Sequence, residues 1–274
     1  MFLQRREEQS RTYFLLQPGK LYLSANLFGG NTVLSEYLRK ICGIINIMDI
    51  KKLVMFDLDG TLINAYEAIY ETLNYTLKQM GYNREETYDS AKRAVGLGDK
   101  KFIEKFFKPM DIEKALKIYN KHHVSIIKNK TFLMEGAKEV ISYLKSKGVF
   151  LAVTSNRPGI SGFPLLESLG IKNYFQKITF GDMVQNPKPH PQMLEDTLNF
   201  FHVDKHQIIF VGDMTIDVQT GKNADVFTAA VSTGSSYVEE LKSFHPDLLY
   251  TSLFDFLKFL KFHKPWDYHN NYAN

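Results

Sequence analysis

The sequence predicts an α/β protein, a doubly wound parallel sheet with an all-helical insertion near its beginning. Two observations lead to this prediction. In the second half of the chain, short and almost continuous apolar runs alternate with amphipathic helical segments, which is the pattern of a parallel sheet covered by helices on both faces. Between residues 66 and 130, by contrast, only helical spacing is found, and this stretch interrupts the alternation.

These patterns divide the chain into a core, an insertion and two terminal segments. We expect the α/β core to comprise residues 48–64 and 131–265, with residues 65–130 forming a helical domain inserted between its two parts. We expect residues 266–274 to be a tail. A chain of 274 residues is long enough to build both domains with a substantial buried core.

Residues 1–47 differ in pattern from the rest of the chain. They contain aromatic residues and the pair Gly29-Gly30 but no sustained period, so we predict an N-terminal extension of uncertain order. Two interpretations stay open. Either this extension is a real appendage with a short hairpin or helix around residues 34–44, or Met48 is the natural start and the upstream residues are dispensable.

The first elements of the core and insertion are predicted by an apolar run followed by a helical repeat. Residues 51–56 form the apolar run, which is typical of a buried strand. The spacing changes to helical over residues 64–80, and Gly81 is typical of a helix end. The apolar residues that recur three and four positions apart are Ile69, Leu73, Leu77 and Met80.

From residue 135 onward, predicted helices and strands alternate. Each strand is a short apolar run, and each helix carries apolar side chains on one face. The expected strands are 149–153, 177–180, 207–211 and 226–231. The expected helices carry the pairs Val140 and Leu144, Leu165 and Leu169, Leu194 and Leu198, and Leu253 and Leu260.

Composition and charge disfavour several classes of function. The net charge of +4, from 34 basic and 30 acidic residues, is too small and too scattered to indicate nucleic-acid binding. No apolar run approaches the ~20 residues that span a bilayer, and the N-terminus lacks the apolar stretch of a signal peptide. The single cysteine, Cys42, excludes an intramolecular disulfide framework. We expect a cytoplasmic protein without nucleic-acid or membrane partners.

Four polar clusters lie near the ends of predicted strands, where a parallel sheet binds its ligands. They are Asp57-Leu58-Asp59-Gly60-Thr61, then Thr154-Ser155-Asn156, then Lys188-Pro189-His190-Pro191, and finally Gly212-Asp213 followed by Asp217. Carboxylates gathered in this number repel one another unless a cation lies among them, and oxygen ligands suit Mg²⁺. A hydroxyl, backbone N–H groups and a lysine suit a phosphate group.

With these four motifs in this order, the chain resembles the haloacid dehalogenase-like hydrolase superfamily. Within it, the chain is most similar to the phosphoglycolate phosphatase type, which carries a helical cap after the first motif. The resemblance covers about residues 50–262. It implies a Rossmann-like core, a mobile cap that closes over the site, and Mg²⁺-dependent hydrolysis of a small phosphate monoester.

The resemblance implies a role for each acidic residue and for the lysine. Asp57 resembles the nucleophile that forms an aspartyl-phosphate. Asp59 resembles the general acid/base that protonates the leaving oxygen and then activates water. The Asp57 carboxylate, the Asp59 backbone carbonyl and Asp213 would hold Mg²⁺. Asp217 would act through water or orient Lys188, which neutralises charge on the transferring phosphoryl group.

The resemblance also implies the phosphate ligands. Ser155 and the backbone of Asn156 would hold phosphoryl oxygens, and the hydroxyl of Thr61 is a further candidate. Ser155 is preferred to Thr154 because family members place the hydroxyl residue directly before an Asn-Lys/Arg-Pro stretch, which continues here with Arg157-Pro158.

Phosphoglycolate is the leading candidate substrate, by resemblance only. The alternatives are a nucleotide or sugar-phosphate phosphatase, a pyrophosphatase and a β-phosphoglucomutase, and we expect a monomer or a homodimer. A non-catalytic regulatory protein on the same fold is a further alternative, which the intact Asp57, Asp59 and Lys188 disfavour. Asp59 favours phosphate chemistry over dehalogenation, because a halide leaving group needs no proton.

Some candidate residues also have simpler explanations. Asp57 or Asp217, taken alone, could cap a helix. The adjacent His122 and His123 have no third ligand nearby in sequence, so we expect a pair on a helix surface rather than a metal site. The capping explanation becomes weaker for Asp57 and Asp217 once the four motifs are considered together. The surface explanation for the two histidines is unaffected.

Within the insertion, Gly96-Leu97-Gly98 is either a plain turn or a loop that closes over the substrate. Arg93 and Lys100 flank it and are candidates for contacting a carboxylate or second phosphate of the substrate. Phe102, Phe106 and Phe107 are expected in the core of the insertion rather than at a cofactor.

Overall fold

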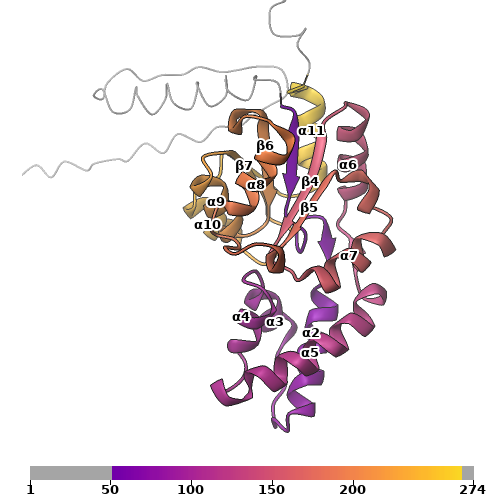
Figure 1. Cartoon of the computed structure of the whole chain (residues 1–274), viewed down its shortest axis with the longest axis vertical. Coiled ribbons are helices and arrows are strands. Elements are labelled where there is room, and N and C mark those ends of the chain that lie inside the picture. The colour runs from indigo at the N-terminus through magenta and orange to yellow at the C-terminus, as the bar shows by residue number, and fades with distance from the viewer. Residues whose placement is uncertain (1–50, 267–274) are drawn as a thin grey trace, which may run out of the picture. The chain divides into compact units, whose positions relative to one another are not determined.

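The structure, a computed structural model, describes residues 51–266. The expected N-terminal extension at 1–47, the alternative start at Met48 and residues 267–274 of the expected tail lie outside the described residues. Figure 1 shows a layered α/β part and a group of helices beyond one end of its strands.

The α/β part is built on a six-stranded parallel sheet with the order β5-β4-β1-β6-β7-β8. The chain therefore winds outward from β1 in both directions, which confirms the predicted doubly wound fold. The strands are β1 (Leu53–Phe56), β4 (Phe150–Ser155), β5 (Lys177–Phe180), β6 (Ile208–Gly212), β7 (Phe227–Val231) and β8 (Leu248–Tyr250).

The central strand β1 is buried on both faces. Because successive side chains of a strand point to opposite faces, Val54 and Phe56 enter one apolar cluster, whereas Leu53 and Met55 enter another. This explains why the strand appears in the sequence as a continuous apolar run rather than as an alternating one.

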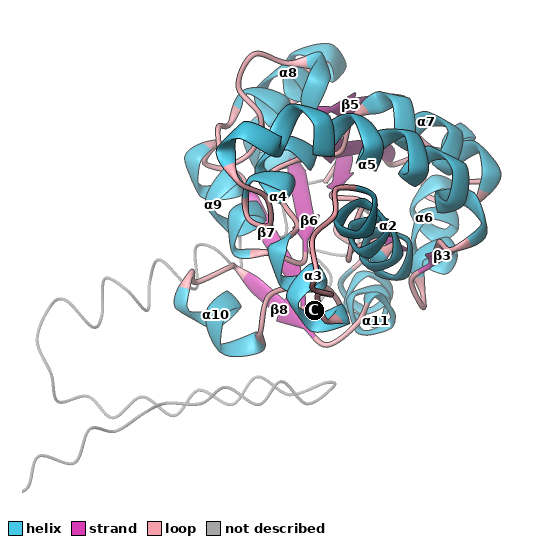
Figure 2. Ribbon diagram, turned by 90° about the horizontal axis from the view of Figure 1, so that it is seen from below, coloured by secondary structure: helices cyan, strands magenta, loops and turns pink. Residues whose placement is uncertain are grey.

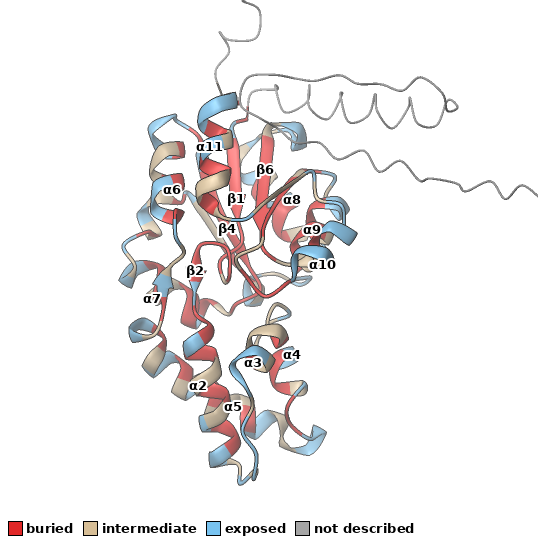
Figure 3. Ribbon diagram, turned by 180° about the vertical axis from the view of Figure 1, so that it is seen from behind, coloured by how far each residue is buried: buried red, intermediate tan, exposed pale blue. Residues whose placement is uncertain are grey.

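Helices cover both faces of the sheet (Figure 2). One face carries α6 (Ala137–Ser146), α7 (Gly159–Ser168) and α11 (Leu253–His263). The other carries α8 (Gln192–Phe201), α9 (Thr215–Asn223) and α10 (Val238–Ser243). Figure 3 shows the strands as a buried layer between them. Among helices of residues 51–266, none has the length and apolar character needed to cross a membrane.

The helical insertion, which we call the cap, lies beyond the carboxyl ends of the strands (Figure 1). The chain enters it through β2 (Ile63–Asn64) and leaves it through β3 (Phe132–Leu133), and these two short strands pair in antiparallel fashion. The expected core residues Phe102, Phe106 and Phe107 are buried. The cap helices are α2 (Tyr66–Gln79), α3 (Tyr88–Ala94), α4 (Asp99–Glu104) and α5 (Ile112–Ile126).

The structure corrects several of the predicted boundaries. Strand β4 continues through Ser155, two residues past the predicted end, so the polar residues Thr154 and Ser155 belong to the strand itself. Four short elements, β2, β3, β8 and α10, were not predicted, because elements of two to six residues are too short to show a period.

Helix α9 approaches the sheet closely because it carries Gly221. A Cβ atom at this position would lie 1.9 Å from Oγ1 of Thr228 on β7. Alanine favours helix by up to ~1 kcal/mol over glycine, so Gly221→Ala would stabilise the protein if space were available. We expect instead that Gly221→Ala lowers the free energy of unfolding by about 1–3 kcal/mol through overpacking, measured by urea unfolding.

The exposed neighbour Lys222 in the same helix provides the control, because Lys222→Ala has no such contact. If Gly221→Ala is as stable as wild type or more stable, the close approach of α9 to β7 does not require glycine at this position.

Candidate active site

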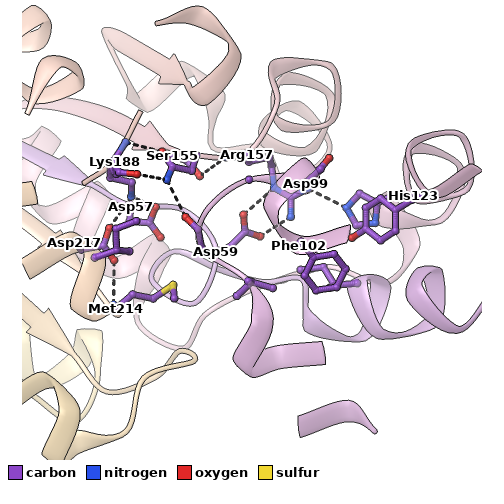
Figure 4. Close-up of a pocket in the computed structure, with 17 residues that line it drawn as sticks. Asp57, Asp59, Asp99, Phe102, His123, Ser155, Arg157, Lys188, Met214 and Asp217 are labelled. Carbon is purple, nitrogen blue, oxygen red and sulfur yellow. Dashed lines mark hydrogen bonds and ion pairs between the residues drawn. The ribbon is translucent and has the colours of Figure 1, made fainter. Parts of the chain in front are cut away.

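A cavity of about 50 Å³ lies between the carboxyl ends of the strands and the cap. Residues at or beyond the carboxyl ends of β1, β4, β5 and β6 line one side, and residues of α2, α4 and α5 line the other. Figure 4 shows that Asp57, Asp59, Ser155 and Lys188 lie together here. The fold therefore brings together motif residues that are more than a hundred positions apart in the sequence.

A buried lysine joins two of the aspartates. The Nζ atom of Lys188 donates to Oδ1 of Asp57 at 2.5 Å and to Oδ1 of Asp217 at 2.6 Å. All three residues are buried. Asp57 directly follows β1, where its backbone N–H donates to Val211 O of β6 at 2.8 Å. The sheet thus fixes the position of this carboxylate.

Burial dominates the electrostatics of these groups. Burial raises the pKa of Asp57 to about 7, although Lys188 lowers it in part. The pKa of Asp213 is raised well above its usual range by burial and by the charges of Asp57 and Asp217. Burial opposes the charge of Lys188 too, but the attraction of Asp217 and Asp57 outweighs it and raises the lysine pKa. One ammonium group does not balance three carboxylates, so a further cation would stabilise their ionised forms.

The three carboxylates can act together as cation ligands. Oxygen atoms of Asp57, Asp213 and Asp217 lie within 4.8 Å of one another. Asp213 is held in place by the Thr61 hydroxyl, at 2.9 Å, and by the Ser235 N–H, at 3.1 Å. An all-oxygen set of this kind suits a hard divalent cation such as Mg²⁺.

Of two further predicted site residues, Thr61 has other contacts than expected, whereas Asp217 contacts Lys188, as one of its two expected roles requires. Thr61, a candidate phosphate ligand, is fully buried and its hydroxyl donates to Asp213 rather than lining the cavity. Asp217 accepts from Lys188 with one oxygen and from Met214 N–H with the other, at 3.0 Å. Both contacts fit a residue that orients its neighbours. Gly60, directly before Thr61, has φ +89°, a conformation that favours glycine.

Ser155 and Asn156 lie at the end of β4, facing the cavity. The Asn156 side chain connects three segments of the chain. Its Nδ2 donates to Gly96 O of the cap at 2.8 Å and to Lys188 O at 2.9 Å, and its Oδ1 accepts from Lys188 N at 2.9 Å. The side chain therefore anchors the Lys188 segment and contacts the cap. Ser155, which is buried, is the hydroxyl residue of this motif that lines the cavity.

The partner of Asp59 was not predicted from the sequence. Arg157 forms a bidentate ion pair with it: Nε donates to Oδ2 at 2.8 Å and Nη2 donates to Oδ1 at 2.6 Å. Burial opposes the charge on Arg157, but Asp59 outweighs it and raises the arginine pKa, with Asp99 adding to the effect. Arg157 follows Ser155 and Asn156 in the same motif, and this proximity was the available signal.

His123 is also a cavity residue, so the prediction of a surface histidine pair is wrong for it. His123 is buried, and its Nε2 lies 3.0 Å from Nη1 of Arg157. Because a guanidinium can only donate, this Nε2 must accept, which requires a neutral imidazole. Burial and the charge of Arg157 lower the His123 pKa accordingly. Its spacing from Ala115 and Tyr119 on the buried face of α5 was the overlooked signal.

The cap loop Gly96-Leu97-Gly98 contacts the core. Gly96 has φ +114° and Gly98 has φ +84°, conformations that favour glycine, and Gly96 O accepts from Asn156. The flanking cations do not line the cavity. Arg93 pairs with Glu240 of α10 at 2.5 Å, and Lys100 is exposed.

Comparison with known proteins gives the family. A family model described as haloacid dehalogenase-like hydrolase matches residues 54–231. A phosphoglycolate phosphatase of Aquifex aeolicus is 32% identical over 216 residues, covering 77% of this chain and 98% of the relative. A pyrophosphatase, PpaX, of Listeria welshimeri is 30% identical over 214 residues, covering 76% of this chain and 95% of the relative.

Solved structures show the same fold at lower identity. A crystal structure described as a predicted phosphoglycolate phosphatase from Haemophilus somnus has a TM-score of 0.71 at 24% identity, covering 76% of this chain and 97% of that one. CbbY from Rhodobacter sphaeroides, in complex with phosphate, has a TM-score of 0.66 at 21% identity, covering 74% and 95%. The motif order, the capped parallel sheet and the family match agree, and the chain belongs to the haloacid dehalogenase-like hydrolase family.

Proposed function

We propose that this enzyme hydrolyses a small phosphate monoester through an aspartyl-phosphate on Asp57. The observation that carries the proposal is the buried Lys188 bridge between Asp57 and Asp217, beside Asp213 and at the floor of a capped cavity. Such a site holds an attacking carboxylate and the positive charge that an incoming phosphoryl group needs.

Asp57 is the proposed nucleophile. Its carboxylate attacks phosphorus and displaces the leaving-group oxygen, and water then hydrolyses the resulting acyl phosphate. Lys188 already contacts Asp57 and would move its hydrogen bonds to the phosphoryl oxygens as these gain charge. Ser155 and the backbone of Asn156 are the proposed ligands for the remaining oxygens.

Asp59 is the proposed acid/base. It lines the cavity and its side chain is partly exposed, unlike that of Asp57. It would give a proton to the leaving oxygen in the first half-reaction and take one from the attacking water in the second. The proton is thus returned within each turnover.

The Asp57 carboxylate, the Asp59 backbone carbonyl and Asp213 are the proposed Mg²⁺ ligands. The fit rests on the oxygen-only donor set and on the excess of buried carboxylates over cations. When bound, Mg²⁺ supplies positive charge that screens the repulsion between an anionic nucleophile and an anionic phosphate.

The names of the relatives suggest two substrate candidates. Phosphoglycolate is the first, because the Aquifex aeolicus relative is a phosphoglycolate phosphatase. Pyrophosphate is the second, because the Listeria welshimeri relative is a pyrophosphatase. In either case the cap, whose apolar residues Ile69, Val95 and Phe102 line the cavity, would exclude bulk water during the reaction.

The test of the proposed function is Asp57→Asn. We expect this variant to lose at least ~10³-fold of the Mg²⁺-dependent hydrolysis of phosphoglycolate and p-nitrophenyl phosphate, because an amide is a poor nucleophile. Activity is measured by phosphate release. Asp196→Asn, at an exposed position of α8, is the matched control and should retain wild-type rates. Substantial activity in Asp57→Asn would refute the mechanism.

Asp59→Asn should separate the two half-reactions. An alkyl ester such as phosphoglycolate needs a proton on its leaving oxygen, so we expect its kcat to fall by about 10²–10⁴-fold. The p-nitrophenolate anion needs little protonation, so it should leave in a burst followed by slow turnover. Rapid-quench kinetics and the intact protein mass measure the burst and the phosphoenzyme. Equal losses in the first step for both esters would contradict the assigned role.

Mg²⁺ should stabilise the protein more strongly as the pH rises. Without metal, burial raises the pKa of Asp57 to about 7. A carboxyl group with a raised pKa contributes stability below its unfolded pKa and loses it as the pH rises through the folded value. Mg²⁺ favours the ionised form, so the increase in Tm between EDTA and Mg²⁺ should be larger at pH 8 than at pH 5.5.

Asp213→Asn should remove most of this increase, because it deletes a proposed ligand without touching the cavity wall. A Mg²⁺-dependent increase in Tm that is independent of pH, or that survives in Asp213→Asn, would rule out the proposed ion site.

A further inference from the structure

The cavity contains a permanent cation, Arg157, that the proposed phosphoryl chemistry does not use. Two cationic side chains line the cavity: Lys188, at the Asp57 end, and Arg157, at the cap end. Figure 4 shows Asp59 between them. Lys188 is committed to Asp57 and Asp217. Arg157 contacts none of the three clustered carboxylates; the carboxylate it pairs with is that of Asp59.

The guanidinium of Arg157 is held in a fixed orientation. On one side it faces both oxygens of Asp59. On the other, Nη1 donates to His123 Nε2 at 3.0 Å and to Ser161 Oγ at 3.3 Å. His123 is in turn fixed by Thr72, whose Oγ1 lies 3.3 Å from Nδ1. A planar arginine held in this way presents a preformed fork for one carboxylate or phosphate group.

Asp59 marks the side of the cavity where the leaving group lies. In an in-line displacement, the leaving oxygen departs on the side of phosphorus opposite the Asp57 nucleophile. Asp59 must reach that oxygen in order to protonate it. Because Arg157 contacts both oxygens of Asp59, the guanidinium lies next to the leaving group rather than next to the transferring phosphoryl group.

Resting on the proposed function, we propose that Arg157 is the receptor for a second anionic group carried by the leaving group of the substrate. This group takes the place of the Asp59 carboxylate on the guanidinium fork. The exchange frees Asp59 to carry a proton to the leaving oxygen, and it involves no covalent step of its own. The substrate class is then a small phosphate ester or anhydride with a carboxylate or phosphate beside the scissile bond.

The rest of the cavity wall supports this assignment. Neither of the cap cations that flank the glycine loop reaches it, since Arg93 pairs with Glu240 and Lys100 is exposed. The wall near the cap is otherwise apolar or aromatic, apart from Asp99, which would repel an anion. Among the residues lining the cavity, Arg157 is therefore the cation placed to receive a second anion. Phosphoglycolate and pyrophosphate both carry one.

The experiment compares two esters of similar size. 2-Phosphoglycolate carries a carboxylate, whereas 2-hydroxyethyl phosphate carries a neutral hydroxyl at the same position. We expect wild-type kcat/KM to favour 2-phosphoglycolate by about 100-fold or more. Arg157→Met should reduce this ratio to below about 5. Arg157→Lys keeps the positive charge but loses the paired N–H donors of the guanidinium. Its kcat/KM ratio should therefore lie between those of wild type and Arg157→Met. Lys100→Met, the matched control, should keep the wild-type ratio.

The ratio distinguishes recognition from a structural role, because a folding defect lowers the rates of both esters together. A ratio near 1 in wild type, or a high ratio that survives in both Arg157 variants, overturns the inference. A ratio that collapses in Lys100→Met overturns it as well. If 2-hydroxyethyl phosphate is hydrolysed equally well and Asp57→Asn abolishes this, the proposed function stands and the inference alone fails. If neither ester is hydrolysed with Mg²⁺, both fail.

A second measurement needs no variant. Phosphonoacetate and 2-hydroxyethylphosphonate differ in the same way as the two esters and cannot be hydrolysed at an ester bond. We expect phosphonoacetate to inhibit p-nitrophenyl phosphate hydrolysis at a concentration at least ~10-fold lower, since a charge-assisted fork contact is lost in the neutral compound. Equal inhibition by the two compounds would overturn the inference even if the Arg157 variants fail to fold.

Discussion

An excess of buried negative charge at one edge of the sheet is the constraint on which the site depends. Strands β1 and β6 are parallel neighbours, so Asp57 and Asp213 follow them at the same edge. Burial raises the pKa of both. Lys188 offsets part of this charge, and the surrounding hydroxyl and N–H donors fix the carboxylates without neutralising them. A cation bound among these carboxylates would supply the compensating charge that Lys188 alone does not.

The cap contributes to the electrostatics of the site as well as covering it. His123 of α5 accepts a hydrogen bond from Arg157, and Arg157 holds Asp59. Asn156 donates to the cap loop at Gly96. Two residues of the cavity therefore contact the cap: Arg157 contacts a cap side chain, and Asn156 contacts the cap backbone. The position of the cap and the arrangement of the core loops are coupled through these contacts, which gives a physical reason for placing substrate selection at the cap side of the cavity.

The fold and most of the site could be predicted because their signals are local. A buried parallel strand needs a continuous apolar run, and a strand end that binds ligands needs polar residues immediately after it. Asp57 and Asp213 directly follow their strands and Ser155 is the last residue of β4, so their meeting at one edge followed from the predicted topology. Lys188 lies farther along the chain, in the loop after β5. Boundaries were less accurate, as β4 shows, because the transition from apolar to polar residues does not coincide with the end of hydrogen bonding.

The sequence by itself determined the capped α/β fold, the family and the carboxylates that gather at the strand ends, since periodicity and motif order depend on neighbours along the chain. Only the tertiary structure decided which side chains pair. Arg157 lies 98 positions from Asp59, and His123 lies 34 positions from Arg157. The helical spacing places His123 on the buried face of α5, but it does not predict the contact with Arg157, which results from packing the cap against the core. The bidentate Asp59–Arg157 ion pair results from the pairing of β1 with β4, which brings the segments after the two strands together.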